Sequence, residues 1–492
     1  MTLQPARTTQ QLEAYRSELR GRSVAVIGAA RSGLACARLL TDIGARVTLA
    51  DRKPADELPE AAAIAAERGF DLLPGFSKFE QLPEVSLIVT SPALRPDHQA
   101  LVPARAAGVE VIGSLELGWR LCPMPVVAIT GTNGKGTCCR LLDQMLARGG
   151  VPHVLAGNIG RPLADAVPSA GPERAERSDA RKGEGWSGAG GADAVAIVEV
   201  SSFQLMSIVD FRPSVAVLLN VAPDHFDWHL GFEEYLGAKA RLFMNQAPDD
   251  FAIINLDDPV ASGLAGGLRA EPLHVSVSRS DVAGRVEGAE LVVELAGRPE
   301  RICGADEFTL RGAHHLPAVL SAAVVARLLG LPPNVIADAI RSYQPPPHHM
   351  EVVARVGEVV FISDSKATNP AAAVADLSAL DRPYVAIVGG KDKGADFAEL
   401  GALLSSGPRA VILIGEAAGR IAGAMGEESD PWRANSLPEA MERALDLARP
   451  GDAVILAPAC SSFDMFDDAS HRGEVFREKA LQLETEHQRS QH

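Results

Sequence analysis

Aromatic residues are scarce in this sequence: they make up 5% of its 492 residues, whereas hydrophobic residues as a whole make up 47%. The cores must therefore be built mainly from Ala, Val, Leu and Ile, with few large rings to anchor them. Such cores are normal where helices pack on parallel β-sheets. The chain is long enough for about three domains.

Basic residues are fewer than acidic ones, with 47 Lys and Arg against 63 Asp and Glu, which gives a net charge of −16. A surface of that charge repels phosphate groups at long range. We therefore expect neither a nucleic acid nor an anionic membrane to bind the surface as a whole. A local basic pocket for a small anion is still compatible with this charge.

Cysteine pairs and long apolar runs are missing as well. None of the six cysteines belongs to a Cys-x-x-Cys pair, which in a long chain indicates reduced thiols in a cytosol. The first 22 residues are polar and charged, without the apolar region of a signal peptide, and no run of 18 apolar residues occurs. We expect a cytoplasmic protein with no membrane span and no solenoid repeats, and we expect it to be a monomer.

What the chain does contain, in residues 126–148, is a short apolar strand, a turn with three glycines and a lysine, and then a helix. This arrangement typically cradles a phosphate, because glycines let backbone N–H groups approach the anion and the helix N-terminus adds partial positive charge. Lys135 would reach the terminal phosphates. We interpret the turn as a phosphate-binding loop with the sequence Gly131-Thr132-Asn133-Gly134-Lys135-Gly136-Thr137.

This loop departs from the usual pattern. Ile129 stands where the first glycine is expected, and Gly136 follows the lysine, so that the first hydroxyl comes one position later, at Thr137. An ordinary Gly-rich turn between a strand and a helix is the alternative interpretation. The strand before the turn and the helix after it favour the phosphate-binding loop.

The N-terminal segment predicts a Rossmann-like unit. Residues 23–30 form a strand and a turn, a helix follows, and a second strand over 45–49 ends just before Asp51 and Arg52. Ala30 replaces the second glycine of the dinucleotide fingerprint, so NAD and another nucleotide both stay open from these residues alone. We expect residues 1–114 to form one small α/β domain.

A second group of polar residues follows buried strands downstream of the phosphate-binding loop. Glu199 lies near the end of one strand, and Asp224 and His225 follow the next. Ligand-binding groups gather at the carboxyl ends of parallel strands, and carboxylate with imidazole there suits Mg²⁺ near a triphosphate. Any one of them alone is more simply a hydrogen-bonded residue at a strand end, and Lys239 by itself is typical of a helix surface.

One segment interrupts this central region and another ends it. Residues 169–193 are rich in Ser, Gly, Glu and Arg and predict a mobile insertion without a core. Pro345-Pro346-Pro347 is a stiff break and a natural hinge. We therefore expect a central domain over residues 115–345 and a third domain over 346–492.

The third domain alternates buried strands with helices, which predicts a second doubly wound sheet. Lysines and hydroxyls follow three of its strands, in Asp364-Ser-Lys366-Ala-Thr368-Asn369, Gly389-Gly-Lys-Asp-Lys393 and Pro458-Ala-Cys-Ser-Ser462-Phe463-Asp464. A Lys-rich turn is more often simply solvated. Three strand ends that carry such groups favour a site for an anionic ligand.

These motifs together resemble the Mur ligase superfamily over nearly the whole chain. The resemblance is carried by the phosphate-binding loop, Glu199-Val-Ser-Ser-Phe-Gln-Leu205, Asn220-x-x-x-Asp224-His225-x-Asp227 and Ala238-Lys239, and by the three motifs of the third domain with Arg472-Gly473. The motifs of the third domain resemble the D-glutamate-adding branch, and Asp364-Ser-Lys-Ala-Thr-Asn369 is the most specific of them.

The resemblance implies an α/β fold of three domains: a Rossmann-like N-terminal domain that binds a UDP-linked substrate, a central P-loop ATPase-like parallel-sheet domain, and a C-terminal Rossmann-like doubly wound domain that binds the amino acid. It implies an ATP-dependent ligase that adds D-glutamate to UDP-N-acetylmuramoyl-L-alanine through an acyl phosphate in peptidoglycan precursor synthesis. No nicotinamide is then needed.

The resemblance also implies roles for individual residues. It implies catalytic roles for Lys135, His225 and Lys239, with Lys239 carbamylated. It implies two Mg²⁺ ions, with metal ligands among Thr137, Glu199, His225 and Lys239. It implies ATP contacts from Gly131, Thr132, Asn133, Gly134, Lys135, Gly136, Thr137, His349 and Asp364. It implies contacts to the UDP substrate from Arg31, Ser32, Asp51, Arg52 and Asn158, and contacts to D-glutamate from Lys366, Thr368, Lys393, Ser462 and Phe463.

Four positions depart from the pattern of that branch. Gly136 replaces a Ser or Thr, His315 and Ala318 replace two asparagines near the nucleotide, and His349 replaces an arginine that meets the phosphates. Gly136 favours a folylpolyglutamate synthase-like glutamate ligase as an alternative. The four departures together motivate a non-catalytic nucleotide-binding relative, and the first domain alone would suit an oxidoreductase.

Overall fold

The computed structural model of the protein describes residues 3–168, 194–310 and 312–490. The insertion expected at 169–193 lies outside the described residues. The chain separates into two compact units, which are described one at a time. The first unit comprises residues 1–221, 236–305 and 317–340, and the second comprises residues 222–235, 306–316 and 341–492.

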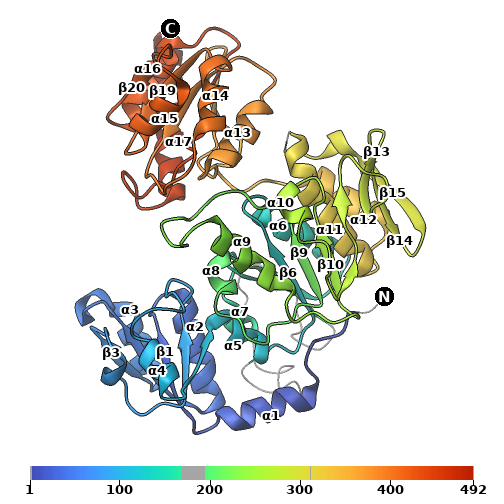
Figure 1. Ribbon diagram of the computed structural model, residues 1–492. Coiled ribbons are helices and arrows are strands. Elements are labelled where there is room, and N and C mark those ends of the chain that lie inside the picture. The colour runs from blue at the N-terminus through green and yellow to red at the C-terminus, as the bar shows by residue number, and fades with distance from the viewer. Residues whose placement is uncertain (1–2, 169–193, 311, 491–492) are drawn as a thin grey trace. The chain divides into compact units, whose positions relative to one another are not determined.

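The N-terminal part of the first unit contains a parallel five-stranded sheet (Figure 1). Its strands are, in spatial order, β3 (Asp71–Pro74), β2 (Arg46–Asp51), β1 (Ser23–Ile27), β4 (Leu87–Thr90) and β5 (Glu110–Gly113). This is the strand order of a Rossmann half, as predicted. The helices of this region are α1 (Thr9–Leu19), α2 (Arg31–Ile43), α3 (Pro59–Arg68), α4 (Val102–Ala106) and α5 (Ser114–Arg120).

The central sheet has six parallel strands and is buried almost throughout. Its order is β11 (Glu271–Pro272), β10 (Phe251–Ile254), β9 (Val215–Leu218), β6 (Val126–Thr130), β8 (Val195–Glu199) and β7 (His153–Gly157). Strand β6 therefore lies between β9 and β8, in the middle of the sheet. The helices here are α6 (Lys135–Arg148), α7 (Leu163–Ala166), α8 (Ser202–Leu205), α9 (Phe232–Ala240) and α10 (Pro259–Ser262).

A small four-stranded sheet follows in the chain, where the sequence is β-rich. It consists of β12 (Val275–Ser276), β13 (Gly284–Glu287), β14 (Glu290–Leu295) and β15 (Arg298–Gly304). Two helices come next, α11 (Leu316–Leu328) and α12 (Pro333–Arg341). Helix α11 is buried over nearly its whole length, as expected of a helix made of Ala, Val and Leu.

The second unit is built on a six-stranded sheet in the order β16 (Glu351–Val356), β17 (Val359–Ser363), β21 (Ala453–Leu456), β18 (Tyr384–Gly389), β19 (Ala410–Ile414) and β20 (Trp432–Arg433). All neighbouring pairs are parallel except β16 with β17. The helices are α13 (Pro370–Ser378), α14 (Ala398–Ser406), α15 (Ala418–Met425), α16 (Leu437–Leu447) and α17 (Ala469–Ser490). The predicted α/β class is thus confirmed in both units.

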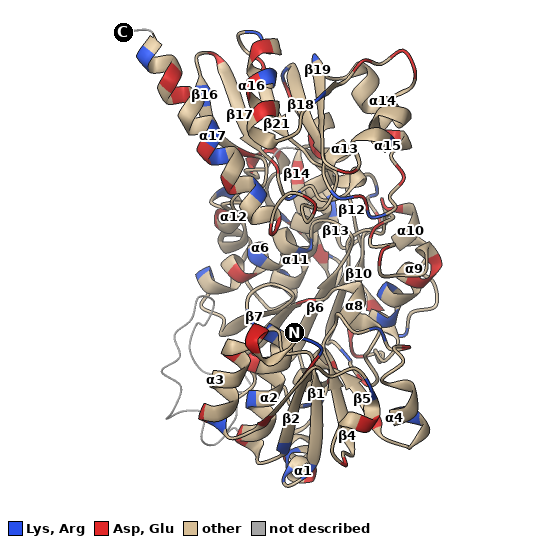
Figure 2. Cartoon of the chain, turned by 90° about the vertical axis from the view of Figure 1, so that its left-hand side faces the viewer, with Lys and Arg blue, Asp and Glu red and all other residues tan. Residues whose placement is uncertain are grey.

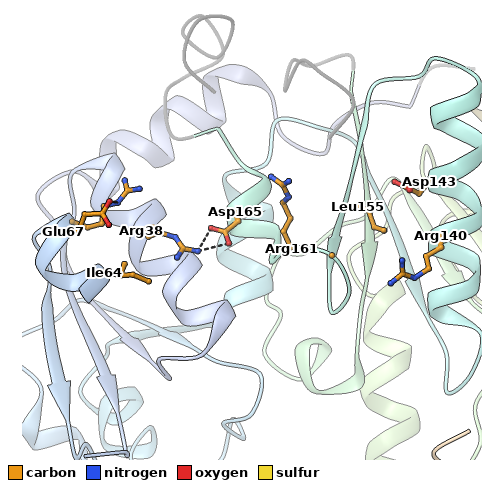
Figure 3. A pocket seen from close by; sticks show the side chains of 10 residues that line it. Arg38, Ile64, Glu67, Arg140, Asp143, Leu155, Arg161 and Asp165 are labelled. Atoms are coloured by element: carbon orange, nitrogen blue, oxygen red, sulfur yellow. Dashed lines mark hydrogen bonds and ion pairs between the residues drawn. The ribbon is translucent and has the colours of Figure 1, made fainter. Parts of the chain in front are cut away.

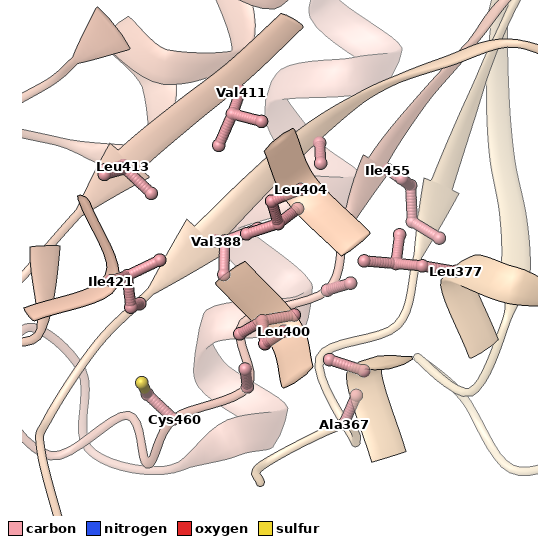
Figure 4. Close-up of a cluster of buried hydrophobic side chains, with 14 of the residues drawn as sticks. Ala367, Leu377, Val388, Leu400, Leu404, Val411, Leu413, Ile421, Ile455 and Cys460 are labelled. Atoms are coloured by element: carbon pink, nitrogen blue, oxygen red, sulfur yellow. The ribbon is translucent and has the colours of Figure 1, made fainter. Parts of the chain in front are cut away.

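Each face of this sheet carries its own apolar core. On one face, Leu377 of α13 and Leu400 and Leu404 of α14 pack against Val388 and Ile455 of the strands (Figure 4). On the other face, helices α16 and α17 pack against the same strands. The outward side of α17 alternates Lys and Arg with Asp and Glu, as is typical of a solvated helix surface (Figure 2).

No helix within the described ranges is both long enough and apolar enough to cross a membrane. The longest helix, α17, has 22 residues and is highly charged.

One buried arginine holds the strand-end loops of the second unit together. Arg472 of α17 has a relative exposure of 1%. Its guanidinium donates hydrogen bonds to the Ser365 hydroxyl (3.0 Å) and the carbonyls of Ser365 (3.0 Å), Cys460 (3.1 Å) and Ser461 (3.3 Å). Burial lowers the pKa of Arg472 to about 10, against the opposing effect of nearby Cys460, Asp464 and Asp364, so the group is still charged at neutral pH.

We expect the substitution Arg472→Lys to destabilise the second unit by about 3 kcal/mol, because lysine lacks the planar fork and leaves several buried oxygen acceptors unpaired. The midpoint of urea unfolding measures this loss. Arg489→Lys, near the exposed end of the same helix, is the matched control and should leave the midpoint unchanged. An Arg472→Lys midpoint equal to that of the control would contradict this account.

Candidate functional site

The loop between β6 and α6 has the geometry of an anion cradle. Gly134 adopts φ +79, a left-handed conformation that favours glycine, and the 14-residue helix α6 begins at the next residue. The ammonium of Lys135 turns back and donates to the carbonyls of Gly131 and Thr132, both at 2.8 Å. The N-terminus of α6, with this lysine beside it, is a suitable place for a phosphate.

Asn220, just beyond β9, fixes the shape of this loop. Its side chain accepts from the Asn133 amide (2.8 Å) and donates to the Asn133 carbonyl (3.1 Å), and its own carbonyl accepts from the Thr132 amide (3.0 Å). Asn220 belongs to one of the motifs that carry the resemblance, but it was not among the expected site residues. Its position at the end of a buried strand was the signal that could have identified it.

Three residues far apart in the sequence gather around the same loop. Glu199, at the end of β8, is 3% exposed and accepts a hydrogen bond from the Asn158 amide group (2.9 Å). A Cβ atom at Gly136 would lie 3.6 Å from the other carboxylate oxygen of Glu199. Lys239 is 1% exposed and donates to the Gly131 carbonyl at 2.7 Å. The interpretation of Lys239 as a helix-surface lysine is therefore wrong, because that face of α9 packs inward.

Glycine is required where β7 ends beside β8. Gly157 adopts φ +102, and a Cβ atom there would lie 2.2 Å from the Glu199 carbonyl oxygen. The Asn158 amide nitrogen donates to that same carbonyl at 2.9 Å. The close approach of the two strand ends is what brings the Asn158 side chain to the Glu199 carboxylate.

The candidate UDP-binding residues fall into two groups. Asp51 and Arg52 line a pocket of about 510 Å³ at the carboxyl edge of the N-terminal sheet. The Asp51 carboxylate already accepts from the amides of Ala29 (2.7 Å) and Lys53 (2.9 Å). Arg31 instead donates to the Gly160 carbonyl, and Ser32 lines a separate small cavity, so neither lines the 510 Å³ pocket.

A larger pocket of about 770 Å³ also lies in the first unit (Figure 3). Four arginines and three acidic residues line it, among them Arg38 and Asp165, which form an ion pair at 2.9 Å. Arg68 is likewise paired, with Asp42 (3.3 Å) and Glu67 (3.4 Å). The mixture of charges makes this pocket only weakly cationic.

In the second unit, the three motifs that end strands β17, β18 and β21 are joined by backbone hydrogen bonds. The Gly389 amide donates to the Pro458 carbonyl (2.8 Å), Ala459 to Ala367 (2.9 Å) and Lys391 to Ser461 (2.8 Å). The structure thus brings together the segments that hold the candidate D-glutamate residues. Of these, Lys366 is exposed, Thr368 and Lys393 are half-buried, Ser462 is buried, and Phe463 is 67% exposed.

Asp224 is the central polar group of this edge. It accepts a hydrogen bond from the Lys393 ammonium at 2.7 Å and lies 3.4 Å from the side-chain amide of Asn369. Burial would raise the pKa of Asp224, but the charges of Lys393 and His225 outweigh it and hold the pKa below its usual range. His225 adopts a left-handed backbone, with φ 60, and its Nε2 lies 3.6 Å from the Asp224 carboxylate.

Around Asp376, in α13, three histidines and a second carboxyl group converge. His314 Nε2 lies 3.0 Å and His315 Nε2 lies 3.7 Å from Asp376 Oδ1. His349 and Asp364 approach the same carboxylate. Burial, together with the charge of Asp376, raises the pKa of Asp364 well above its usual value.

Two histidines of this group, His315 and His349, are held neutral by their surroundings. Burial, reinforced by neighbouring His314, lowers the pKa of His315 to about 3, although Asp376 opposes the shift. Burial also lowers the pKa of His349. Burial would raise the pKa of Asp376, but its hydrogen bond to His314 and the neighbouring imidazoles hold it below the ordinary value.

The chain is similar to known protein families over most of its length. Three family descriptions match successive parts of the chain: "Mur ligase MurD-like, N-terminal domain" over residues 22–113, "Mur ligase middle domain" over 129–326 and "Mur ligase, glutamate ligase domain" over 348–460. The chain belongs to the Mur ligase family.

Curated relatives of this Mur ligase carry the name UDP-N-acetylmuramoylalanine--D-glutamate ligase. The relative from Pelotomaculum thermopropionicum is 38% identical, over 94% of this chain and 98% of the relative. Those from Geobacter metallireducens and Acidobacterium capsulatum are each 37% identical, over 94% of this chain and 97% of the relative.

Solved structures of other Mur ligases share the fold. A pseudomurein peptide ligase type C from Methanothermus fervidus matches with a TM-score of 0.58 at 18% identity, over 94% of this chain and 100% of that one. UDP-N-acetylmuramate-alanine ligase from Thermotoga maritima matches with a TM-score of 0.55 at 16% identity, over 94% of this chain and 99% of that one. The predicted three-domain architecture is confirmed.

We expect the stability of this Mur ligase to fall as the pH drops below the usual His pKa of 6.5, because His315 takes up a proton in the unfolded chain but not in the fold until about pH 3. Over that window the unfolded state binds more protons, which costs up to about 1.4 kcal/mol per pH unit and per group. Urea unfolding in the presence of EDTA at several pH values measures the slope.

The variant His315→Asn should show a smaller slope than the native chain. His471→Asn removes a half-exposed imidazole on α17 and serves as the matched control. Equal slopes for the native chain and His315→Asn would show that this histidine does not contribute to the pH dependence.

Proposed function

We propose that this Mur ligase joins D-glutamate to UDP-N-acetylmuramoyl-L-alanine at the expense of ATP, releasing ADP and phosphate, as a step of peptidoglycan precursor synthesis. The observation that carries the proposal is the pair of strand-end sites. A phosphate-binding loop ends the middle strand of one sheet, and lysines and hydroxyls end three adjacent strands of another. The choice of substrates follows the names of the full-length relatives, which are called D-glutamate ligases.

The chemistry requires both sites. A carboxylate does not react with an amine at neutral pH, because its oxygen is a poor leaving group. Phosphorylation converts it to an acyl phosphate, and the D-glutamate amine then attacks the carbonyl carbon through a tetrahedral intermediate, from which phosphate leaves. Lys135 and the N-terminus of α6 offset the negative charge of the transferred phosphoryl group.

For ATP we propose contacts from residues 131–137, as inferred from the sequence, together with His349 and Asp364. A Thermotoga maritima Mur ligase with this fold was solved in complex with ADP, which supports a nucleotide here. The donor set fits Mg²⁺, because the buried carboxylate of Glu199 lies against the first turn of α6 near Thr137. We propose Thr137, Glu199, His225 and Lys239 as metal ligands. When bound, Mg²⁺ would neutralise phosphate charge.

Lys239 fits that role only after modification. As an ammonium it donates to the Gly131 carbonyl and cannot bind a cation. Carbamylation would turn it into an anionic oxygen ligand at the same buried position. We propose this modification, because without it Lys239 would place a positive charge beside the proposed cation ligands.

The remaining assignments are proposals as well. For the UDP substrate we propose Arg31, Ser32, Asp51, Arg52 and Asn158, and for D-glutamate Lys366, Thr368, Lys393, Ser462 and Phe463. We propose domain boundaries after residues 114 and 345, a monomeric state, and a cytoplasmic location, in which ATP is available and thiols stay reduced.

One observation favours a second function. Gly136, in place of a hydroxyl residue, suits a folylpolyglutamate synthase-like glutamate ligase. The two functions differ in the acceptor: the first requires UDP-N-acetylmuramoyl-L-alanine with D-glutamate, and the second a folate with L-glutamate.

We expect phosphate release from ATP only when UDP-N-acetylmuramoyl-L-alanine and D-glutamate are both present, measured with a coupled phosphate assay. Lys135→Ala should abolish turnover and leave the fold intact, because the hydrogen bonds that its ammonium makes among the described residues go to two carbonyls of its own loop. Lys78→Ala, an exposed lysine of the N-terminal domain, is the control for loss of a surface charge. Release with folate and L-glutamate instead would favour the second function, and full activity of Lys135→Ala would refute the phosphate-binding loop.

We expect Lys366→Ala to raise the KM for D-glutamate about 10–100-fold, because one charge-assisted hydrogen bond to a carboxylate is worth about 1.5–3 kcal/mol. The KM for ATP should change much less. Steady-state kinetics with each substrate varied in turn measures both constants, and Lys78→Ala again serves as control. A rise confined to the KM for ATP would assign Lys366 to the nucleotide instead.

A further inference from the structure

The cluster around Asp376 has the composition of a metal site. His314 and His315 come from the short 3₁₀ segment Ala313–His315, His349 follows the proline-rich break, and Asp364 follows β17. Two overlapping sets of ligand atoms, one from His314, His315 and Asp376 and one from His349, Asp364 and Asp376, each lie within 4.8 Å of one another. All these residues belong to the second unit.

We propose that these five residues bind a divalent transition-metal ion of the Zn²⁺ class, with His314, His315 and Asp376 as its principal ligands and His349 and Asp364 beside them. The proposal does not depend on the ligase activity. Its residues all belong to the second unit, whereas Glu199 and Lys239 belong to the first. Two of them, His349 and Asp364, are also the proposed ATP contacts of this unit.

The spacing of the ligand atoms supports the proposal. Two ligands of a tetrahedral ion with bonds of about 2.0–2.1 Å lie about 3.3 Å apart. The two distances from Asp376 Oδ1, 3.0 Å to His314 Nε2 and 3.7 Å to His315 Nε2, lie on either side of that value. The imidazole rings of His314 and His315 lie side by side, with centroids 3.9 Å apart. Small side-chain rotations would therefore complete the set.

Two buried atoms of the cluster lack a hydrogen-bond partner among the described residues. They are Nε2 of His315, a residue 6% exposed, and Oδ2 of Asp364, which is fully buried. A buried polar atom without a partner costs about 1–3 kcal/mol. A cation bound by His314, His315 and Asp376 would give the His315 atom a partner, and a cation closer to His349 and Asp364 would do the same for Asp364.

The ligand types decide the class of ion. Imidazole with one or two carboxylates suits Zn²⁺, Co²⁺ and related ions, whereas Mg²⁺ prefers oxygen ligands and water. Two of the three histidines, His315 and His349, stand at positions where this chain departs from the pattern of the D-glutamate-adding branch.

The test measures metal binding by the whole protein without nucleotide, after removal of metals with EDTA. We expect one equivalent of Co²⁺ to bind and to give the visible absorption bands of a tetrahedral ion. We expect added Zn²⁺ to displace the Co²⁺ and abolish these bands. The double variant His315→Asn, His349→Arg carries the residue types of the related branch. It should weaken Zn²⁺ binding by more than about 10-fold, because loss of a residue that only hydrogen-bonds to a metal ligand already costs that much. His471→Asn should bind as the native chain does.

Two outcomes would overturn the proposal: no stoichiometric Co²⁺ or Zn²⁺ binding, or equal affinity in the native chain and the double variant. Thermal unfolding checks that the variant is folded. If it is not, His314→Gln, which changes a side chain with 31% exposure, replaces it in the same titration. Because the titration measures neither turnover nor nucleotide binding, failure of the metal proposal is distinguishable from failure of the proposed ligase function.

Discussion

Parallel pairing of fully buried strands is the constraint on which the rest of this structure depends. Strands β6, β8 and β9 are buried along their whole lengths, as are β17, β18 and β21. Such strands must be apolar throughout, so polar groups can enter only where a strand ends. Glu199 is the last residue of its strand, and the loop between β6 and α6 and the Asp224–Lys393 pair lie beyond strand ends.

Charged groups that do enter the interior are closely paired or bonded. Arg472 satisfies four acceptors in the loops after β17 and β21, and Lys393 neutralises Asp224. Because a buried charge without partners is costly, these contacts hold the loops in one arrangement. Loops that carry site residues thus gain rigidity from side chains that do not themselves face a substrate.

The segments around the strand-end motifs of the second unit also contain unusual backbone conformations. His225, His348, Met350 and Ala459 have positive φ values, between 49° and 61°. Non-glycine residues adopt this region at a cost, and such residues gather where the surrounding structure holds them in place. Here they occur in the segments after strands or next to the strand-end motifs. The conformation directs the side chain of His225 back toward Asp224.

The sequence by itself determined the class of fold, the places where strands end, and the glycine-rich turn between β6 and α6, because these depend on local apolar runs and on glycine. It also identified the lysine and hydroxyl motifs of the third domain. Only the tertiary structure decided which residues meet. Lys239 is buried against the loop rather than exposed, Asn220 shapes that loop, and three histidines converge on Asp376. These contacts depend on strand order and helix packing, which join positions that are distant in the sequence; a local pattern such as the strand end before Asn220 marks a polar residue but not its partner.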